Sequence, residues 1–199
     1  MRGQFEYFGL KSKEARAVRK EIYQAHSYPK DTSTIKKLVR LCFKQEFREL
    51  HYFGIEVVEK NIKNQEEGFI AFLEEMITTK SWWDSVDWIN NFIGIHFKRY
   101  PKLQKKYAYK WIEGENIWLA RVAIIHQLKY KNKMDQDLLF DLIYLTRKSD
   151  EFFIRKAGGW ALRQLSRFDS SAVINFVDTN PDLSGLTKRE ALRLLKKNQ

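Results

Sequence analysis

The chain is poor in the residues that break or cross-link a fold. Among 199 residues there are one cysteine, three prolines and nine glycines. A single Cys42 cannot form an internal disulfide, which fits a reducing compartment, and the low Gly+Pro content excludes a fibrous or loop-rich chain. No apolar run approaches the roughly 20 residues that a membrane helix needs, and residues 1–9 lack the apolar core of a signal peptide. We therefore expect a cytoplasmic, globular protein that does not enter a membrane.

Recognisable catalytic motifs are also scarce. The four histidines pair with no cysteine at metal-ligand spacing, so we expect no metal site. The sequence contains no Gly-rich phosphate loop and no Gly-x-Ser-x-Gly elbow. We therefore expect no cofactor, and we interpret Cys42 as a small core residue.

Charge and apolar residues are plentiful. The chain is 44% hydrophobic and 15% aromatic, which excludes a disordered basic tail, and its net charge is +11. Net charges of residues 1–50, 51–100, 101–150 and 151–199 are +6, −3, +4 and +4. An excess of this size fits either solvated helix faces or a surface for a polyanion such as nucleic acid, and charge alone leaves both open.

Apolar residues recur at helical spacing along nearly the whole chain, which predicts an all-α fold. Ser12 is the expected N-cap of the first helix. The predicted helical ranges are about 12–26, 35–42, 47–58, 66–79, 83–98, 102–112, 116–130, 135–147, 151–166, 170–178 and 187–197.

An internal repeat underlies these helices. Aromatic residues near the start of every second helix recur at Phe47, Trp83, Trp118 and Phe153, at spacings of 36, 35 and 35. Helix pairs of that length are typical of an α-solenoid. We therefore predict one continuous domain over residues 1–199, a right-handed solenoid of short HEAT-like antiparallel helix pairs whose concave face carries the function.

The most unusual segment is Thr79–Trp88, where three of the six tryptophans fall within seven residues beside two carboxylates. Trp83 and Asp87 are four residues apart and so share one face of a helix. An indole beside a carboxylate forms a compact site for a cation. The alternative is that these tryptophans are core residues and Asp84 is an acid at the helix N-terminus.

Basic residues occupy the equivalent positions of the next two repeats. Arg121 lies between apolar stretches and is either a packing ion-pair partner or a phosphate ligand. Trp160 and Arg163 are three residues apart and share one face of a helix. Arg155, Lys156, Arg163 and Arg167 form a dense basic group, which is either a solvated face or a phosphate track. Two adjacent glycines, 158–159, are costly inside a helix and require close approach of another backbone or of a ligand.

At these residues the chain resembles the AlkD-type DNA alkylation repair glycosylases, a family of HEAT-like repeat proteins. The similarity spans nearly the whole chain and is densest in a few segments taken together. These are 80–87 (KSWWDSVD), 110–112, 116–121 (NIWLAR), 127–131, 151–154, 159–160 and 189–191.

The resemblance implies hydrolysis of the N-glycosidic bond of N3- and N7-alkylated purines in double-stranded DNA, with no cofactor. Trp83 and Trp160 match tryptophans that contact DNA at the lesion, and Asp87 matches the carboxylate that stabilises the developing sugar cation. Arg121 and Arg163 match phosphate-contacting arginines. We place the remaining predicted DNA contacts at Lys80, Trp82, Phe153, Arg155 and Lys156.

One departure from the family pattern concerns the N-terminus. The family has a helical segment before the stretch matched by residues 5–9, and this chain begins close to that stretch, while Lys11 stands where the family has a glutamine. We expect a monomer that acts on DNA. The alternatives are a non-catalytic HEAT-like module that binds damaged or branched DNA, and a protein-binding scaffold. A carboxylate within a basic groove favours the enzyme, because a phosphate-binding surface gains nothing from it.

Overall fold

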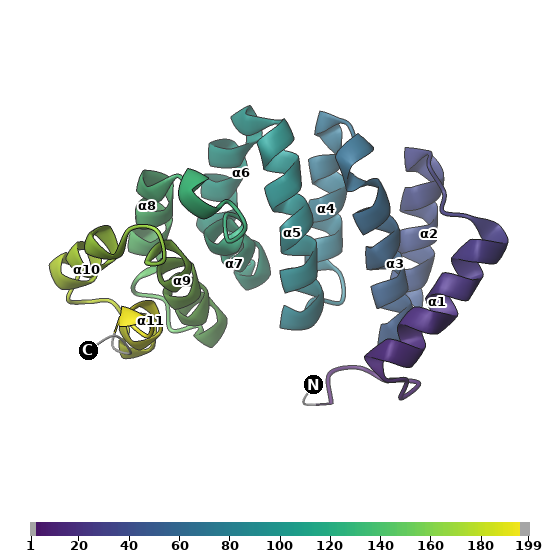
Figure 1. Cartoon of the computed structure of the whole chain (residues 1–199), viewed down its shortest axis with the longest axis horizontal. Coiled ribbons are helices and arrows are strands. Elements are labelled where there is room, and N and C mark those ends of the chain that lie inside the picture. The colour runs from purple at the N-terminus through teal and green to yellow at the C-terminus, as the bar shows by residue number, and fades with distance from the viewer. Residues whose placement is uncertain (1–2, 196–199) are drawn as a thin grey trace. The chain divides into compact units, whose positions relative to one another are not determined.

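The computed structural model describes residues 3–195, and in that range the protein is built from α-helices and three short 3-10 helices, with no strand. The all-α prediction is therefore confirmed. The α-helices are α1 (Ser12–His26), α2 (Thr32–Lys44), α3 (Arg48–Asn61), α4 (Ile70–Thr78), α5 (Trp83–Arg99), α6 (Pro101–Glu113), α7 (Ile117–Ile125), α8 (Gln136–Thr146), α9 (Phe152–Leu165), α10 (Ser170–Thr179) and α11 (Gly185–Ala191) (Figure 1). The 3-10 helices are Ile62–Asn64, Glu67–Phe69 and Lys131–Lys133.

Side-chain caps fix the starts of five of the described α-helices, α2, α7, α8, α10 and α11. Asp31 accepts a hydrogen bond from the Thr34 amide at 2.8 Å, and Asn116 caps α7 in the same way. The prediction of Ser12 as an N-cap is wrong. The cap of α1 is Lys11, whose backbone N–H donates to the Glu14 carboxylate at 3.0 Å.

Two predicted helices end early. The helix expected over 116–130 ends at Ile125, because the buried Gln127 amide binds a backbone segment further along the chain. Its Nε2 donates to the Asp135 carbonyl at 3.1 Å and its Oε1 accepts from the Asp135 amide at 2.7 Å, which holds the chain in a turn. The helix expected over 187–197 ends at Ala191, and residues 196 and 197 lie outside the described residues.

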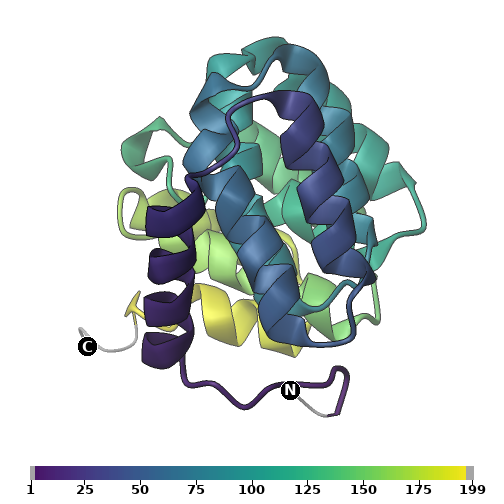
Figure 2. The same ribbon diagram turned by 90° about the vertical axis from the view of Figure 1, so that its right-hand side faces the viewer.

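The chain packs as two compact units, residues 1–92 and 93–199, with the boundary inside α5. In the first unit α2 packs against α3, and both bury apolar faces in a core that also takes residues from α4 and the start of α5. α1 lies beside α3 and is joined to it by the Arg19–Glu56 ion pair (Figure 2).

In the second unit, α7 packs against α6 and α9, and α9 packs against α11. The latter packing explains the second glycine of the 158–159 pair. A Cβ at Gly159 would lie 2.5 Å from the Glu190 Cβ and 2.9 Å from the Thr187 carbonyl oxygen of α11. Close approach of another helix, the first of the two reasons expected from the sequence, is therefore the reason found for Gly159.

Side chains within each unit link elements about one repeat length apart. Five such links are separated by 35 to 37 residues in the sequence and several others by 32 to 34, close to the spacings of 35 and 36 predicted from the aromatic residues. The five join Arg19 to Glu56, Arg40 to Glu75, Arg48 to Asp84, Tyr130 to Gly94 and Arg147 to Asp182. The repeat is thus present in the packing, whereas the hand of the solenoid, its concave face and the single domain remain predictions.

Candidate active site

The first turn of α5 presents the tryptophan-rich segment. Trp83 is the first residue of the helix and is 45% exposed, an unusual exposure for so large an apolar side chain. Trp82 and Trp88 are half-buried. Trp83 is therefore not a core residue. Asp87 lies one turn later on the same helix, is half-buried, and its backbone carbonyl accepts a hydrogen bond from the Asn91 side chain.

A buried arginine holds this turn in place. Arg48, at the start of α3, is fully buried and binds Asp84 through two nitrogens, Nε to Oδ2 at 3.0 Å and Nη2 to Oδ1 at 2.7 Å. Its Nη1 donates to the Lys80 carbonyl at 2.8 Å, and its Nη2 donates to the Ser85 hydroxyl at 2.6 Å. The Tyr52 hydroxyl donates to Asp84 Oδ2 at 2.5 Å. A paired fork of this kind fixes both partners in orientation.

The ionisation of these groups follows from that pairing. Burial opposes ionisation of Asp84, but the hydrogen bonds from Arg48 and Tyr52 outweigh burial and hold the pKa of Asp84 below its ordinary value. Burial, together with the hydrogen bond to Asp84, raises the pKa of Tyr52. Asp84 is thus a structural carboxylate that is kept ionised, which agrees with the alternative interpretation of Asp84 as an acid at a helix N-terminus.

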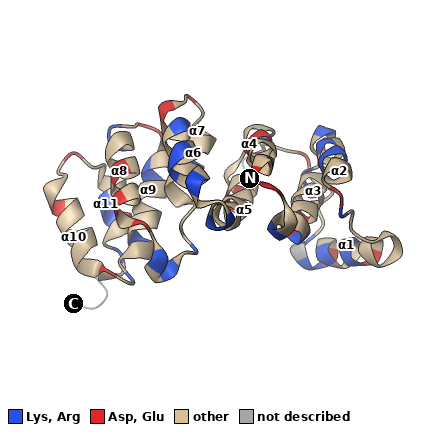
Figure 3. Cartoon of the chain, turned by 90° about the horizontal axis from the view of Figure 1, so that it is seen from above, with Lys and Arg blue, Asp and Glu red and all other residues tan. Residues whose placement is uncertain are grey.

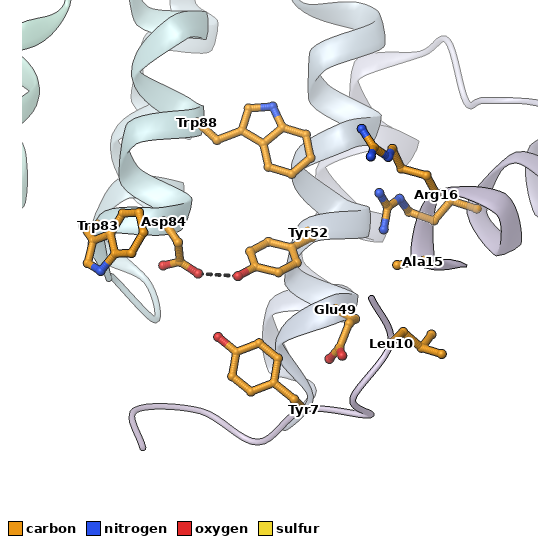
Figure 4. Close-up of a pocket in the computed structure, with 10 residues that line it drawn as sticks. Tyr7, Leu10, Ala15, Arg16, Glu49, Tyr52, Trp83, Asp84 and Trp88 are labelled. Carbon is orange, nitrogen blue, oxygen red and sulfur yellow. Dashed lines mark hydrogen bonds between the residues drawn. The ribbon is translucent and has the colours of Figure 1, made fainter. Parts of the chain in front are cut away.

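A cavity of about 530 Å³ opens beside Trp83 (Figure 4). Its walls come from α1, α3, the start of α5 and the N-terminal segment, and its aromatic members are Tyr7, Tyr52, Trp83 and Trp88. The N-terminal segment is held there by the Glu49 carboxylate, which accepts from the amides of residues 8 and 9 at 3.2 Å each. An aromatic cavity thus adjoins the exposed indole within the first unit.

In the second unit the structure brings together three of the predicted site residues. Arg121 is buried, its Nη1 donates to the Phe153 carbonyl at 2.8 Å, and its guanidinium lies 5.8 Å from the Phe153 ring centroid and 5.9 Å from that of Trp160. Trp118 packs against Phe153, with ring centroids 4.8 Å apart. Arg121 therefore orders the aromatic residues around Trp160.

The other predicted basic residues pair with acids. Lys156 Nζ lies 2.6 Å from Glu190 Oε1, and Arg163 binds the second oxygen of the same carboxylate. Lys156 and then Arg163 hold the pKa of Glu190 below its ordinary value against the effect of burial. Arg155 pairs with the exposed Asp150. One carboxylate shared by two cations leaves one positive charge on this group, which a phosphate can use.

The Lys80 backbone is strained, because its φ of +48° lies in the left-handed region that residues other than glycine rarely occupy. Its own side chain is exposed. The predicted lesion-contacting residues thus form two groups, Trp83 with Asp87 in the first unit, and Trp160 with Arg121 and Arg163 in the second. That both groups meet one lesion remains a prediction.

Arg48 and Tyr52 were not predicted from the sequence. An arginine near a helix start looks like a surface residue, so its burial carries no local signal. The available signal was the spacing of 36 residues between Arg48 and Asp84, which equals one repeat.

Charge is spread over both units, with Lys and Arg prominent on α1, α2 and α6 (Figure 3). Within residues 3–195 no helix is long and apolar enough to span a bilayer. Among the same residues, no cluster of three or more His, Cys, Asp or Glu side chains could hold a metal ion.

These features define an all-helical repeat protein with an aromatic, partly acidic site on a basic chain. The family model for the DNA alkylation repair enzymes matches residues 1–195, so this chain belongs to the DNA alkylation repair enzyme family. A search of the curated proteins found no significant match.

Solved structures agree with this assignment. A predicted DNA alkylation repair enzyme from Enterococcus faecalis is 31% identical, with a TM-score of 0.88 over 98% of this chain and 91% of that one. AlkD2 from Streptococcus mutans is 15% identical, with a TM-score of 0.68 over 93% and 90% of the two chains. The protein smu.31 from Streptococcus mutans UA159 is 16% identical, with a TM-score of 0.66 over 90% and 89%. The last two show a shared fold.

Proposed function

We propose that this protein is a DNA glycosylase that removes positively charged N3- and N7-alkylated purines from double-stranded DNA. The observation that supports this most is the exposed Trp83 one helical turn before Asp87, in a chain of the DNA alkylation repair family. A protein that only binds phosphates has no use for an indole and a carboxylate presented together.

The proposed reaction hydrolyses the bond between C1′ of deoxyribose and the purine nitrogen. Alkylation makes the base a cation, so it leaves with the bonding electron pair as a neutral base. The sugar left behind is an oxocarbenium-like cation. Water then forms the new bond to C1′ and gives up a proton, which leaves an abasic site and the free base.

Each proposed catalytic residue acts on the developing charge. Asp87 stabilises the cationic sugar electrostatically and orients the attacking water, while Trp83 and Trp160 offer aromatic faces to the same cation. Arg121 and Arg163 bind phosphates beside the lesion, with Lys80, Trp82, Phe153, Arg155 and Lys156 on the remaining DNA surface. The protein acts as a monomer in the cytoplasm, where its DNA substrate lies.

The test is release of free base from a duplex that contains 7-methylguanine. We expect the wild-type protein to release the base, and Asp87→Asn to lose most of that activity while it still binds DNA. Asp178→Asn, at an exposed position of α10 away from these residues, is the matched acid control and should keep the wild-type release. Unchanged release by Asp87→Asn would remove Asp87 from the mechanism.

The second candidate is a module that binds damaged DNA without chemistry. The cavity walled by four aromatic residues favours it, because stacking surfaces of this kind bind unpaired bases. Tight binding of lesion-containing duplex by the wild-type protein, with no free base after long incubation, would support this alternative.

A further inference from the structure

Arg48 has no part in the proposed chemistry, yet it is among the most highly connected side chains of the described residues. It is 0% exposed, and its donors reach Asp84 twice, the Lys80 carbonyl and the Ser85 hydroxyl. The Phe5 ring covers the guanidinium, with its centroid 3.9 Å from Cζ. Four hydrogen bonds therefore run from one side chain to residues 80–85.

Those residues carry the exposed tryptophan. Lys80 precedes Trp83 by three residues, and its left-handed φ of +48° directs the chain into α5. A non-glycine residue in that conformation costs about 1 kcal/mol or more and persists only when its surroundings hold it. The bond from Arg48 Nη1 to the Lys80 carbonyl, at 2.8 Å, is the contact that holds it.

Stability alone does not explain such an arrangement. A buried ion pair often adds little to stability compared with apolar residues of similar volume, because both ions lose their hydration. What a bidentate arginine does supply is geometry, since its planar fork sets both the distance and the angle of the partner carboxylate. Tyr52 adds a further bond to the same carboxylate at 2.5 Å.

We infer that Arg48 is a positioning residue, which acts through Lys80, Asp84 and Ser85 to set the orientation of Trp83 and Asp87 for base release. The inference rests on the proposed function for its kinetic consequence. Its structural part, the orientation of Trp83 by Arg48, is independent of any activity.

The principal test is Arg48→Lys, which keeps the positive charge and removes the fork. With enzyme in excess over a duplex containing 7-methylguanine, we expect the single-turnover rate of base release to fall about 10- to 100-fold, as for other small misplacements of reacting groups. The affinity for undamaged duplex should change by less than about 2-fold, because no phosphate contact is lost.

The matched control is Arg40→Lys. Arg40 also binds a carboxylate through two nitrogens, Glu75 at 2.7 Å for both contacts, but the pair is exposed and lies at α2 and α4. Arg40→Lys should leave the single-turnover rate of base release within about 2-fold of wild type, because an exposed ion pair contributes little. Equal losses in the two variants would overturn the inference.

A rescue separates positioning from loss of stability. Glycine adopts a positive φ without strain, so the effect of Arg48→Lys should be several-fold smaller in a Lys80→Gly background than in the wild-type background. An undiminished loss in that background would show that Arg48 does not act through the Lys80 backbone.

A measurement on Trp83 itself tests its orientation independently of base release. The indole N–H resonance of Trp83, assigned with a Trp83→Phe variant, should move in Arg48→Lys and stay in place in Arg40→Lys. An unmoved resonance overturns the inference whether or not the wild-type protein releases base, whereas a moved resonance without base release refutes the proposed function alone. If Arg48→Lys does not fold, Ser85→Ala takes its place, because it removes one acceptor of the fork together with the bond from the Ser85 hydroxyl to the Trp82 carbonyl at 3.1 Å.

Discussion

Because His126 is buried, we predict that the protein loses stability as the pH falls from about 6.5 to 4. Its ring lies in the second unit, 2% exposed, with Nδ1 2.7 Å from the Ala123 carbonyl and Nε2 3.1 Å from the Gln104 side-chain amide nitrogen. The carbonyl requires a proton on Nδ1, so Nε2 accepts from Gln104 and the ring is neutral. Burial lowers the pKa of His126 from 6.5 to about 4.

The sign follows from proton uptake. Below pH 6.5 the unfolded chain binds a proton at this histidine, whereas the folded protein binds one only near pH 4, so acidification favours the unfolded state across this range. The difference in pKa corresponds to about 3 kcal/mol, which is present above pH 6.5 and absent below pH 4. For a domain of ordinary stability this is a large share of the free energy of unfolding.

Urea unfolding at several pH values between 7 and 4, followed by circular dichroism, measures this slope. Burial also lowers the pKa of His51, and carboxylates with lowered pKa values such as Glu190 add to the slope near pH 4, so the comparison with His126→Gln isolates one contributor. Between pH 6.5 and 4, the free energy of unfolding of the variant should change with pH less steeply than that of the wild type. The difference in slope should be about 1.4 kcal/mol per pH unit, the value for one proton.

A glutamate at position 104 sharpens the test. Gln104→Glu would give Nε2–H a carboxylate partner and raise the pKa of His126 toward 6.5, so that less stability is lost between pH 6.5 and 4. If His126→Gln unfolds with the wild-type pH dependence, the assignment of the neutral, buried ring is refuted.

Three further predictions concern packing, charge and reactivity. Gly159→Ala should destabilise the protein by about 1–3 kcal/mol in urea unfolding, since the added carbon meets α11 at 2.5 Å. Gly158→Ala, whose added carbon meets only ordinary contacts at 3.5 Å, should be neutral or stabilising by up to about 1 kcal/mol, and equal effects would contradict the close approach. Glu190→Gln should free two cations and steepen the salt dependence of duplex binding, and an unchanged slope would exclude them from the phosphate contacts. Cys42 is buried and its pKa is raised to about 11 by burial, so a thiol reagent should label it only after unfolding, and rapid labelling of the native protein would contradict this.

The helices and their repeat were predictable because both depend on local patterns. Asp31 and Asn116 cap α2 and α7, and two of the aromatic residues that mark the repeat, Trp118 and Phe153, are in contact. The helix expected over 116–130 failed because the Gln127 amide binds the Asp135 backbone, an interaction that periodicity does not carry.

The sequence predicted which residue types form the candidate site, but it did not predict how exposed they are or which residues they pair with. The sequence singled out Trp83, but its exposure depends on how the Arg48 fork directs the chain into α5. The sequence also predicted Lys156 and Arg163 as phosphate ligands. Their shared partner Glu190 lies on α11, which packs against α9 only in the folded protein. Ion pairs between distant positions are set by tertiary structure, which no window of the sequence contains.

Links that each span one repeat have a consequence for how the protein opens. If every tertiary contact joins only neighbouring repeats, the free energy of folding is a sum of couplings between neighbours. The chain can then unfold one repeat at a time. α1 lies at one end of its unit, and the Arg19–Glu56 ion pair and the stacked rings of Tyr23 and Phe53 join it to α3. Its amide hydrogens should exchange with solvent well before those of α3, so that the unit frays from this end while its centre stays closed.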